Sequence, residues 1–136
     1  AASDVYKRQQ HACPMWVPLI ESNQHQTDIG KKLIENDIHE LLAMSSSIDT
    51  ILLACTHYPL IISEVKKIVG EKINVISQGP IVADKLLDYL QRNEFMRVQL
   101  SKGGTCSFLT TENAGVFNAS ATQFLENAIS AEQIRL

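Results

Sequence analysis

Three adjacent residues, Cys55, Thr56 and His57, are the part of this chain best suited to chemistry. A free cysteine thiol has a pKa of about 8.5, so a modest perturbation gives a thiolate that can abstract a proton or attack a carbonyl. The imidazole of His57 could assist that ionisation or act as an acid, and the Thr56 hydroxyl could donate a hydrogen bond to a carboxylate. The alternative is a buried structural cysteine with a hydrogen-bonded histidine at the end of a strand.

The apolar run 51–54 directly precedes these residues and predicts a short buried strand. In open α/β sheets, ligands bind at the carboxyl ends of the strands, which is where this strand would deliver the thiol. If strand geometry persisted, Cys55 and His57 would point to one face of the sheet and Thr56 to the other. A helix starting at 59–60 would also direct its N-terminal amide groups to this place, which favours an anion.

The neighbouring segments alternate between helix and strand patterns. Apolar residues at three- and four-residue steps predict a helix from Thr27 to the serine loop 45–47, and a second over 60–69 that ends at Gly70. Residues 73–76 predict another strand, and Gly79-Pro80 opens a helix with the inner face Ile81, Val82, Leu86, Leu87 and Leu90. This order predicts right-handed βαβ units and a parallel sheet of the α/β class.

The remaining segments are less regular. Residues 16–20 lie between two prolines, which favours an irregular or edge segment. Residues 97–100 and 106–111 could pair as strands across a glycine turn or form extended loops. Ser120 could cap a last helix that carries Phe124, Leu125, Ala128 and Ile129.

Composition excludes several classes of protein. The 136 residues, 45% hydrophobic and 20% charged, are enough for one soluble domain with a core. A net charge of −3, spread along the chain, argues against nucleic acid or an anionic membrane as the main partner. No apolar stretch approaches the roughly 18 residues that span a bilayer, and no signal-peptide pattern is visible. We interpret 1–10 as a disordered or foreign leader, with a native loop or fraying helix as the alternative.

Three separated cysteines, Cys13, Cys55 and Cys106, indicate free thiols in a reducing compartment, so we expect a cytoplasmic protein. The pairs His11 with Cys13 and Cys55 with His57 could bind zinc if the two segments met in space. The one-residue spacing within each pair differs from the usual spacing in structural zinc sites, so we expect no metal.

Three segments of the sequence resemble bacterial glutamate racemases, within the aspartate/glutamate racemase family. Residues 48–60 closely resemble the second cysteine motif of that family, and residues 12–21 resemble a second block at about the expected distance upstream. Residues 75–83 are similar to the strand-and-helix segment that follows. The resemblance covers roughly residues 11–92, and we expect the remainder to be the family's C-terminal part.

The resemblance implies a three-layer parallel-sheet fold, two pseudo-symmetric α/β domains with the active site between them, and no pyridoxal phosphate, metal or other cofactor. One thiolate would remove the α-proton of glutamate, and an opposite thiol would return a proton to the other face. This reaction would supply D-glutamate for peptidoglycan synthesis. By resemblance Cys55 is the second acid/base, His57 assists it, and Thr56 and His57 contact the substrate carboxylate. Glu21 matches an acidic residue near the active site. The presence of His57 after Thr56 favours a glutamate racemase over an aspartate racemase. The full-length protein could form a homodimer.

The family's Asp-Ser-Gly-rich opening strand and Cys-Asn-Thr motif do not occur in this sequence. We therefore expect residues 11–136 to be the C-terminal portion of a racemase, an incomplete fold that does not racemise glutamate alone. Other functions remain open: an aspartate racemase, a small non-catalytic α/β module that binds a carboxylate, or a thiol hydrolase or transferase with Cys55 as nucleophile and His57 as base.

Overall fold

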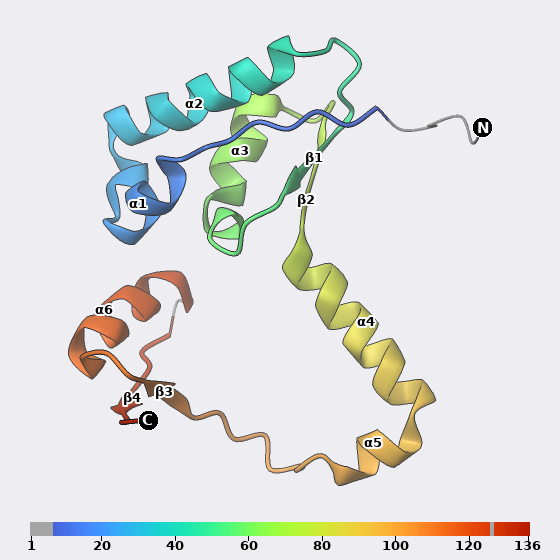
Figure 1. The fold of residues 1–136 in the computed structure, drawn as a ribbon, viewed down its shortest axis with the longest axis vertical. Helices are drawn as coiled ribbons and strands as arrows, with labels where there is room; N and C mark the ends of the chain where they lie inside the picture. Colours follow the sequence, from blue (N-terminus) through green and yellow to red (C-terminus); the bar gives the residue numbers. More distant parts are fainter. Residues whose placement is uncertain (1–6, 126) are drawn as a thin grey trace. The chain divides into compact units, whose positions relative to one another are not determined.

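The computed structural model describes residues 7–125 and 127–136, and these divide into two compact units (Figure 1). The first unit extends to Asp84 and the second begins at Lys85. Of the expected leader, residues 1–6 lie outside the described residues, and 7–10 form neither helix nor strand. The elements of the first unit are α1 (Trp16–Glu21), η1 (Gln24–Gln26), α2 (Asp28–Ala43), β1 (Thr50–Leu53), η2 (Tyr58–Ile61), α3 (Ile62–Val69), β2 (Asn74–Ser77) and the start of α4 (Gln78–Arg92).

The two strands of the first unit pair in parallel, so the predicted α/β class is confirmed. Ile51 lies opposite Val75 in this register, and both side chains are buried. Leu52 points to the other face and is 52% exposed. In the described residues the sheet is therefore covered on one face only, which is an incomplete form of the expected three-layer arrangement.

The helices that cover this face follow the predicted apolar periods. The side chain of Thr27 accepts a hydrogen bond from the Gly30 N–H and caps α2, which then packs beside α3 (Figure 1). Gly70 ends α3 with φ of 69°, a conformation that glycine adopts without the steric cost of a Cβ. The hydrophobic core of this unit consists of Trp16, Leu19, Ile20, Ile34, Ile38, Ile51, Leu53, Ile61, Val65 and Val75.

The second unit contains a further parallel pair. Its elements are the remainder of α4, then α5 (Glu94–Gln99), β3 (Phe108–Thr110), α6 (Ala114–Leu125) and β4 (Ala131–Gln133). β3 and β4 pair in parallel, with Phe108 opposite Ala131, and α6 connects them. No helix in the described part of the chain is long and apolar enough to cross a membrane.

The prediction of an irregular segment at 16–20 is wrong, because these residues form α1. Pro18 is the third residue of that helix, within the first turn, where backbone N–H groups have no intrahelical acceptor. The proline therefore removes no hydrogen bond from the helix. The apolar residues Trp16, Leu19 and Ile20 then lie on its buried side.

Three expectations for the later chain are also wrong. Residues 97–100 do not form a strand, since α5 continues to Gln99, and β3 pairs with β4 instead. Ser120 lies inside α6, whose first turn is capped by the Asn113 side chain through the N–H groups of Gly115 and Val116. The predicted inner face of α4 is not buried among the described residues.

Candidate functional site

The predicted catalytic motif forms the loop that follows β1. The strand ends at Leu53, two residues before Cys55, so the motif does not continue the strand geometry. The expected alternation of side chains across the sheet therefore does not apply. Cys55 lies instead in a bend between β1 and η2, at the carboxyl end of the strand as predicted.

The backbone amides after the motif are not arranged as predicted for a helix N-terminus. The N–H of Tyr58 donates to the carbonyl of Cys55 at 3.2 Å, and the N–H of Leu60 donates to the carbonyl of His57 at 3.0 Å. Pro59 has no N–H, and α3 begins only at Ile62. The N–H groups of Tyr58 and Leu60 therefore already donate to carbonyls of the preceding loop.

His57 connects the motif to α1. Its Nε2 lies 3.1 Å from Oε1 of Glu21, and its Nδ1 lies 3.5 Å from the Thr56 hydroxyl oxygen. The side chains of His57 and Glu21 are 35% and 64% exposed, so the pair is open to solvent and to a ligand. Three of the four predicted site residues thus form one connected group, although they come from positions 36 residues apart.

Cys55, the fourth predicted residue, is partly exposed and forms no side-chain hydrogen bond with the described residues. In particular, His57 bonds to Glu21 and Thr56 rather than to the thiol. This arrangement leaves the sulfur free to approach a substrate. It gives no support to a nucleophile–base pair made by Cys55 and His57.

Tyr58 fastens this loop to the N-terminal segment. Its hydroxyl donates to the carbonyl of Cys13 at 3.2 Å, and its ring packs against Trp16 with centroids 4.8 Å apart. Burial raises the pKa of the Tyr58 hydroxyl, and the nearby Cys13, Cys55 and Asp37 raise it further. Tyr58 therefore remains a neutral hydrogen-bond donor that positions the loop.

The sequence analysis did not identify Asp37 as an important residue. Its Oδ2 accepts a hydrogen bond of 2.6 Å from the Trp16 indole, and its Oδ1 lies 3.2 Å from His11 Nε2. A signal was available, because Asp37 follows Ile34 by three residues and precedes Ile38. It therefore lies at the edge of the buried stripe of α2, where an unpaired carboxylate would be costly.

The zinc set considered from the sequence does not assemble in the described residues. His11 and Cys13 cluster with Asp37, and neither Cys55 nor His57 belongs to that group. Burial raises the pKa of Cys13 to about 12, with a further contribution from the charge of Asp37. An open depression between α2 and α3 is also lined by none of the predicted site residues.

Comparison with known proteins supports the resemblance seen in the motifs. No protein-family model matches the chain. The glutamate racemase of Streptococcus agalactiae (serotype Ia) is 34% identical over 128 residues, which are 92% of this chain and 46% of that protein. The glutamate racemase of Ruegeria sp. is 36% identical over 76% of this chain and 37% of its own length.

Solved structures show the same relationship. Glutamate racemase isoform RacE1 from Bacillus anthracis matches 98% of this chain and 49% of its own, with a TM-score of 0.79 and 29% identity. The glutamate racemase of Francisella tularensis, solved with D-glutamate, has a TM-score of 0.69 at 23% identity, which shows the shared fold alone. The chain spans about half the length of the curated relatives that it matches. The resemblance drawn from the cysteine motif is thereby confirmed, and this chain corresponds in sequence and fold to about half of a glutamate racemase.

Proposed function

We propose that this chain is the C-terminal portion of a glutamate racemase that needs no cofactor, and that it supplies one of two thiol acid/bases. The observation that carries the proposal is the position of Cys55. Its unpaired thiol lies in the loop at the carboxyl end of β1, beside a His57–Glu21 pair, in a chain that resembles glutamate racemases.

In the proposed reaction, the thiolate of Cys55 removes the α-proton from one enantiomer of glutamate. The electron pair of the C–H bond stays on the α-carbon, and a second thiol, supplied by the rest of the protein, gives a proton to the opposite face. No oxidation or reduction occurs, and each turnover leaves the two thiols with exchanged protonation states. The reverse direction uses the same groups in the opposite order.

Thr56 and His57 are the proposed contacts for the substrate carboxylate. Among the described residues, their backbone N–H groups have no acceptor, and the Thr56 side chain is close to the imidazole. Donors fixed around a carboxylate stabilise the negative charge that develops when the α-proton leaves. We propose that Glu21 holds the imidazole in place and that His57 assists the thiol.

The wider role follows from the same proposal. D-glutamate made by the full-length protein would enter peptidoglycan synthesis in the cytoplasm. The full-length protein could form a homodimer. We expect the purified 136-residue chain not to racemise glutamate, because the second thiol and its substrate contacts are absent from this sequence.

The first experiment is to read the coding sequence upstream of residue 1. We expect an in-frame Asp-Ser-Gly-rich segment followed by a Cys-Asn-Thr motif. A start codon close to residue 11 without such a segment would contradict the proposal and favour a module that binds a carboxylate without catalysis.

The second experiment uses the protein encoded by that complete reading frame. Cys55→Ser should abolish racemisation in both directions, because inversion needs both thiols. In deuterated water, one enantiomer of glutamate should still exchange its α-proton through the remaining thiol, whereas the other should not. Cys106→Ser is the matched control and should keep full turnover, since that thiol is exposed and belongs to the second unit. Racemisation that survives Cys55→Ser, or a preference for aspartate, would refute the assignment.

A further inference from the structure

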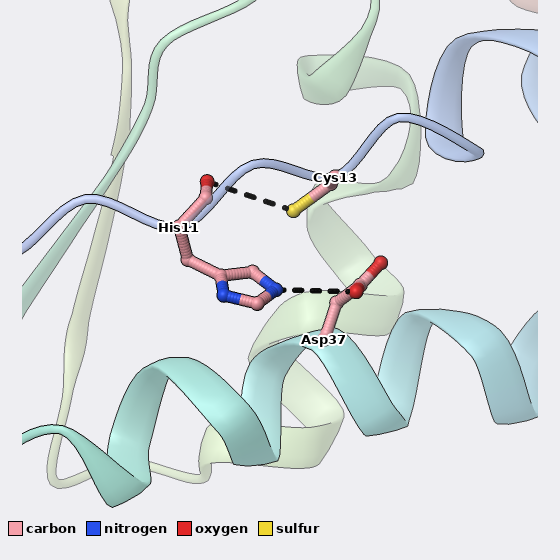
Figure 2. Close-up of side chains that lie close together, drawn as sticks. All are labelled: His11, Cys13 and Asp37. Carbon is pink, nitrogen blue, oxygen red and sulfur yellow. Dashed lines mark hydrogen bonds and ion pairs between the residues drawn. The ribbon is translucent and has the colours of Figure 1, made fainter.

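Three potential metal ligands of different chemistry meet beside α2. His11 and Cys13 come from the segment before α1, and Asp37 projects toward them from the middle of α2 (Figure 2). One imidazole nitrogen, the thiol sulfur and one carboxylate oxygen all lie within 4.8 Å of one another. This cluster contains none of the residues assigned to the racemase reaction, and the following inference does not depend on that assignment.

The spacing of these atoms suits a small divalent ion. Zinc binds nitrogen, oxygen and sulfur ligands at about 2.0–2.3 Å, so neighbouring ligands around a tetrahedral ion lie roughly 3.4–3.7 Å apart. The distance from His11 Nε2 to Asp37 Oδ1 is already 3.2 Å. The segment that carries His11 and Cys13 is neither helix nor strand at those positions, so a small movement could complete the geometry.

The residues around the cluster also hold its ligands in place, as in known metal sites. The Trp16 indole N–H holds Oδ2 of Asp37 at 2.6 Å and leaves Oδ1 directed at His11. Hydrogen bonds of this kind to a ligating carboxylate are a regular feature of metal sites. The side chains of His11 and Asp37 are only 13% and 22% exposed, so a bound ion would be partly shielded from water.

A fourth ligand is within reach. Oε2 of Glu40 lies 3.8 Å from Nε2 of His11, and its side chain is 71% exposed and able to turn. Glu40 follows Asp37 by three residues, which places both carboxylates on the same side of α2. Imidazole, thiolate and two carboxylates would give a four-coordinate ion, with water as an alternative fourth ligand.

A purely structural hydrogen-bond network is the competing explanation, and it does not involve the thiol of Cys13. Asp37 with Trp16 and His11 could simply fix the N-terminal segment to α2. The thiol of Cys13, however, has only a 4.0 Å contact with the carbonyl of His11. We propose that His11, Cys13 and Asp37 bind a divalent ion of the zinc class, with Glu40 as the fourth protein ligand.

Such an ion would have a structural role. It would tie the segment before α1 to α2 through three side chains. Because the carbonyl of Cys13 accepts the hydrogen bond from Tyr58, it would also hold the loop that follows Cys55. When the ion binds, the thiol proton is released to solvent and no redox change occurs.

The test is titration of the chelator-treated, reduced chain with Zn²⁺ by calorimetry and with Co²⁺ by absorption spectroscopy. We expect one ion per chain, and a thiolate-to-cobalt charge-transfer band that reports coordination by Cys13. Cys13→Ser should abolish the band and weaken Zn²⁺ binding at least tenfold, and His11→Ala should weaken binding by a similar factor. The controls Cys106→Ser and His39→Ala remove an exposed thiol and an exposed imidazole and should leave both readouts unchanged.

Circular dichroism of each variant separates loss of a ligand from loss of the fold. Absence of stoichiometric Zn²⁺ binding by the folded chain would overturn the proposal. So would a cobalt band that survives Cys13→Ser but disappears in Cys55→Ser, since the ion would then lie at the candidate active site. A folded His11→Ala variant that binds Zn²⁺ as tightly as the parent chain would also contradict it.

Discussion

Replacing Gly30 by alanine should destabilise the first unit, although alanine is the better helix former. Gly30 is the third residue of α2, and a Cβ built on it lies 2.1 Å from the backbone oxygen of Gln24 and 3.0 Å from the Cα of His25. The first distance is more than an ångström shorter than an ordinary van der Waals contact. Both neighbours are backbone atoms of η1, so they cannot move away as the end of a side chain could.

The expected magnitude combines two opposing effects. Alanine in a helix is favoured over glycine by about 1 kcal/mol, whereas overpacking of a close contact typically costs about 1–3 kcal/mol and sometimes more. Because the clash involves backbone and His25 is itself 4% exposed, we place the cost at the upper end of that range. The net loss in the free energy of unfolding should be about 1–2 kcal/mol.

Gly79→Ala provides the matched control for this measurement. Gly79 is the second residue of α4, also in a first helical turn, and a Cβ there meets nothing within 4 Å. Urea denaturation followed by circular dichroism should show a lower midpoint for Gly30→Ala and an equal or higher midpoint for Gly79→Ala, with unchanged slopes. Equal midpoints for the two variants would refute the argument that the contact between η1 and α2 excludes a side chain at residue 30.

Three further predictions concern the same unit. Trp16→Phe removes the donor to Asp37 and should lower the free energy of unfolding by about 1.5–3 kcal/mol, measured by urea denaturation, because that hydrogen bond is to a charged group. Ile61→Ala should cost about 2–5 kcal/mol in the same assay, since Ile61 is fully buried, whereas Leu52→Ala on the open face of β1 should change stability little. The raised pKa of Cys13 implies that its neutral form is favoured in the folded state, so this contribution is complete below pH 9 and declines as pH rises from 9 toward 12. Denaturation midpoints should therefore fall in this interval, and Cys13→Ala should reduce the fall.

The first unit was largely predictable because its local signals agree with one another. The apolar period of α2 coincides with the Thr27 cap, and the period of α3 coincides with the stop at Gly70. The run before Cys55 is a strand in both the prediction and the structure. Where two independent local preferences indicate the same element, tertiary contacts stabilise that element and do not override it.

The errors arose where a local rule has a positional exception or where the result depends on distant residues. Pro18 suggested an irregular segment, but a proline in the first turn of a helix is tolerated. The apolar stripe of α4 is real in the sequence, yet these side chains are not buried among the described residues. Periodicity predicts which face of a helix could be buried and cannot state what covers it.

The same distinction explains the candidate site. Position along the chain placed Cys55 just after a strand, and the structure has it in the loop that follows β1. The hydrogen-bond partners of the two histidines could not be predicted in this way, because Glu21 lies 36 residues from His57 and Asp37 lies 26 residues from His11. The Trp16 indole donates to Asp37 of α2, and Glu21 joins α1 to the loop before η2, and no local pattern encodes either pairing. Because Trp16 donates directly to Asp37, which in turn contacts His11, a change at Trp16 should disturb the cluster at His11 more directly than the thiol of Cys55.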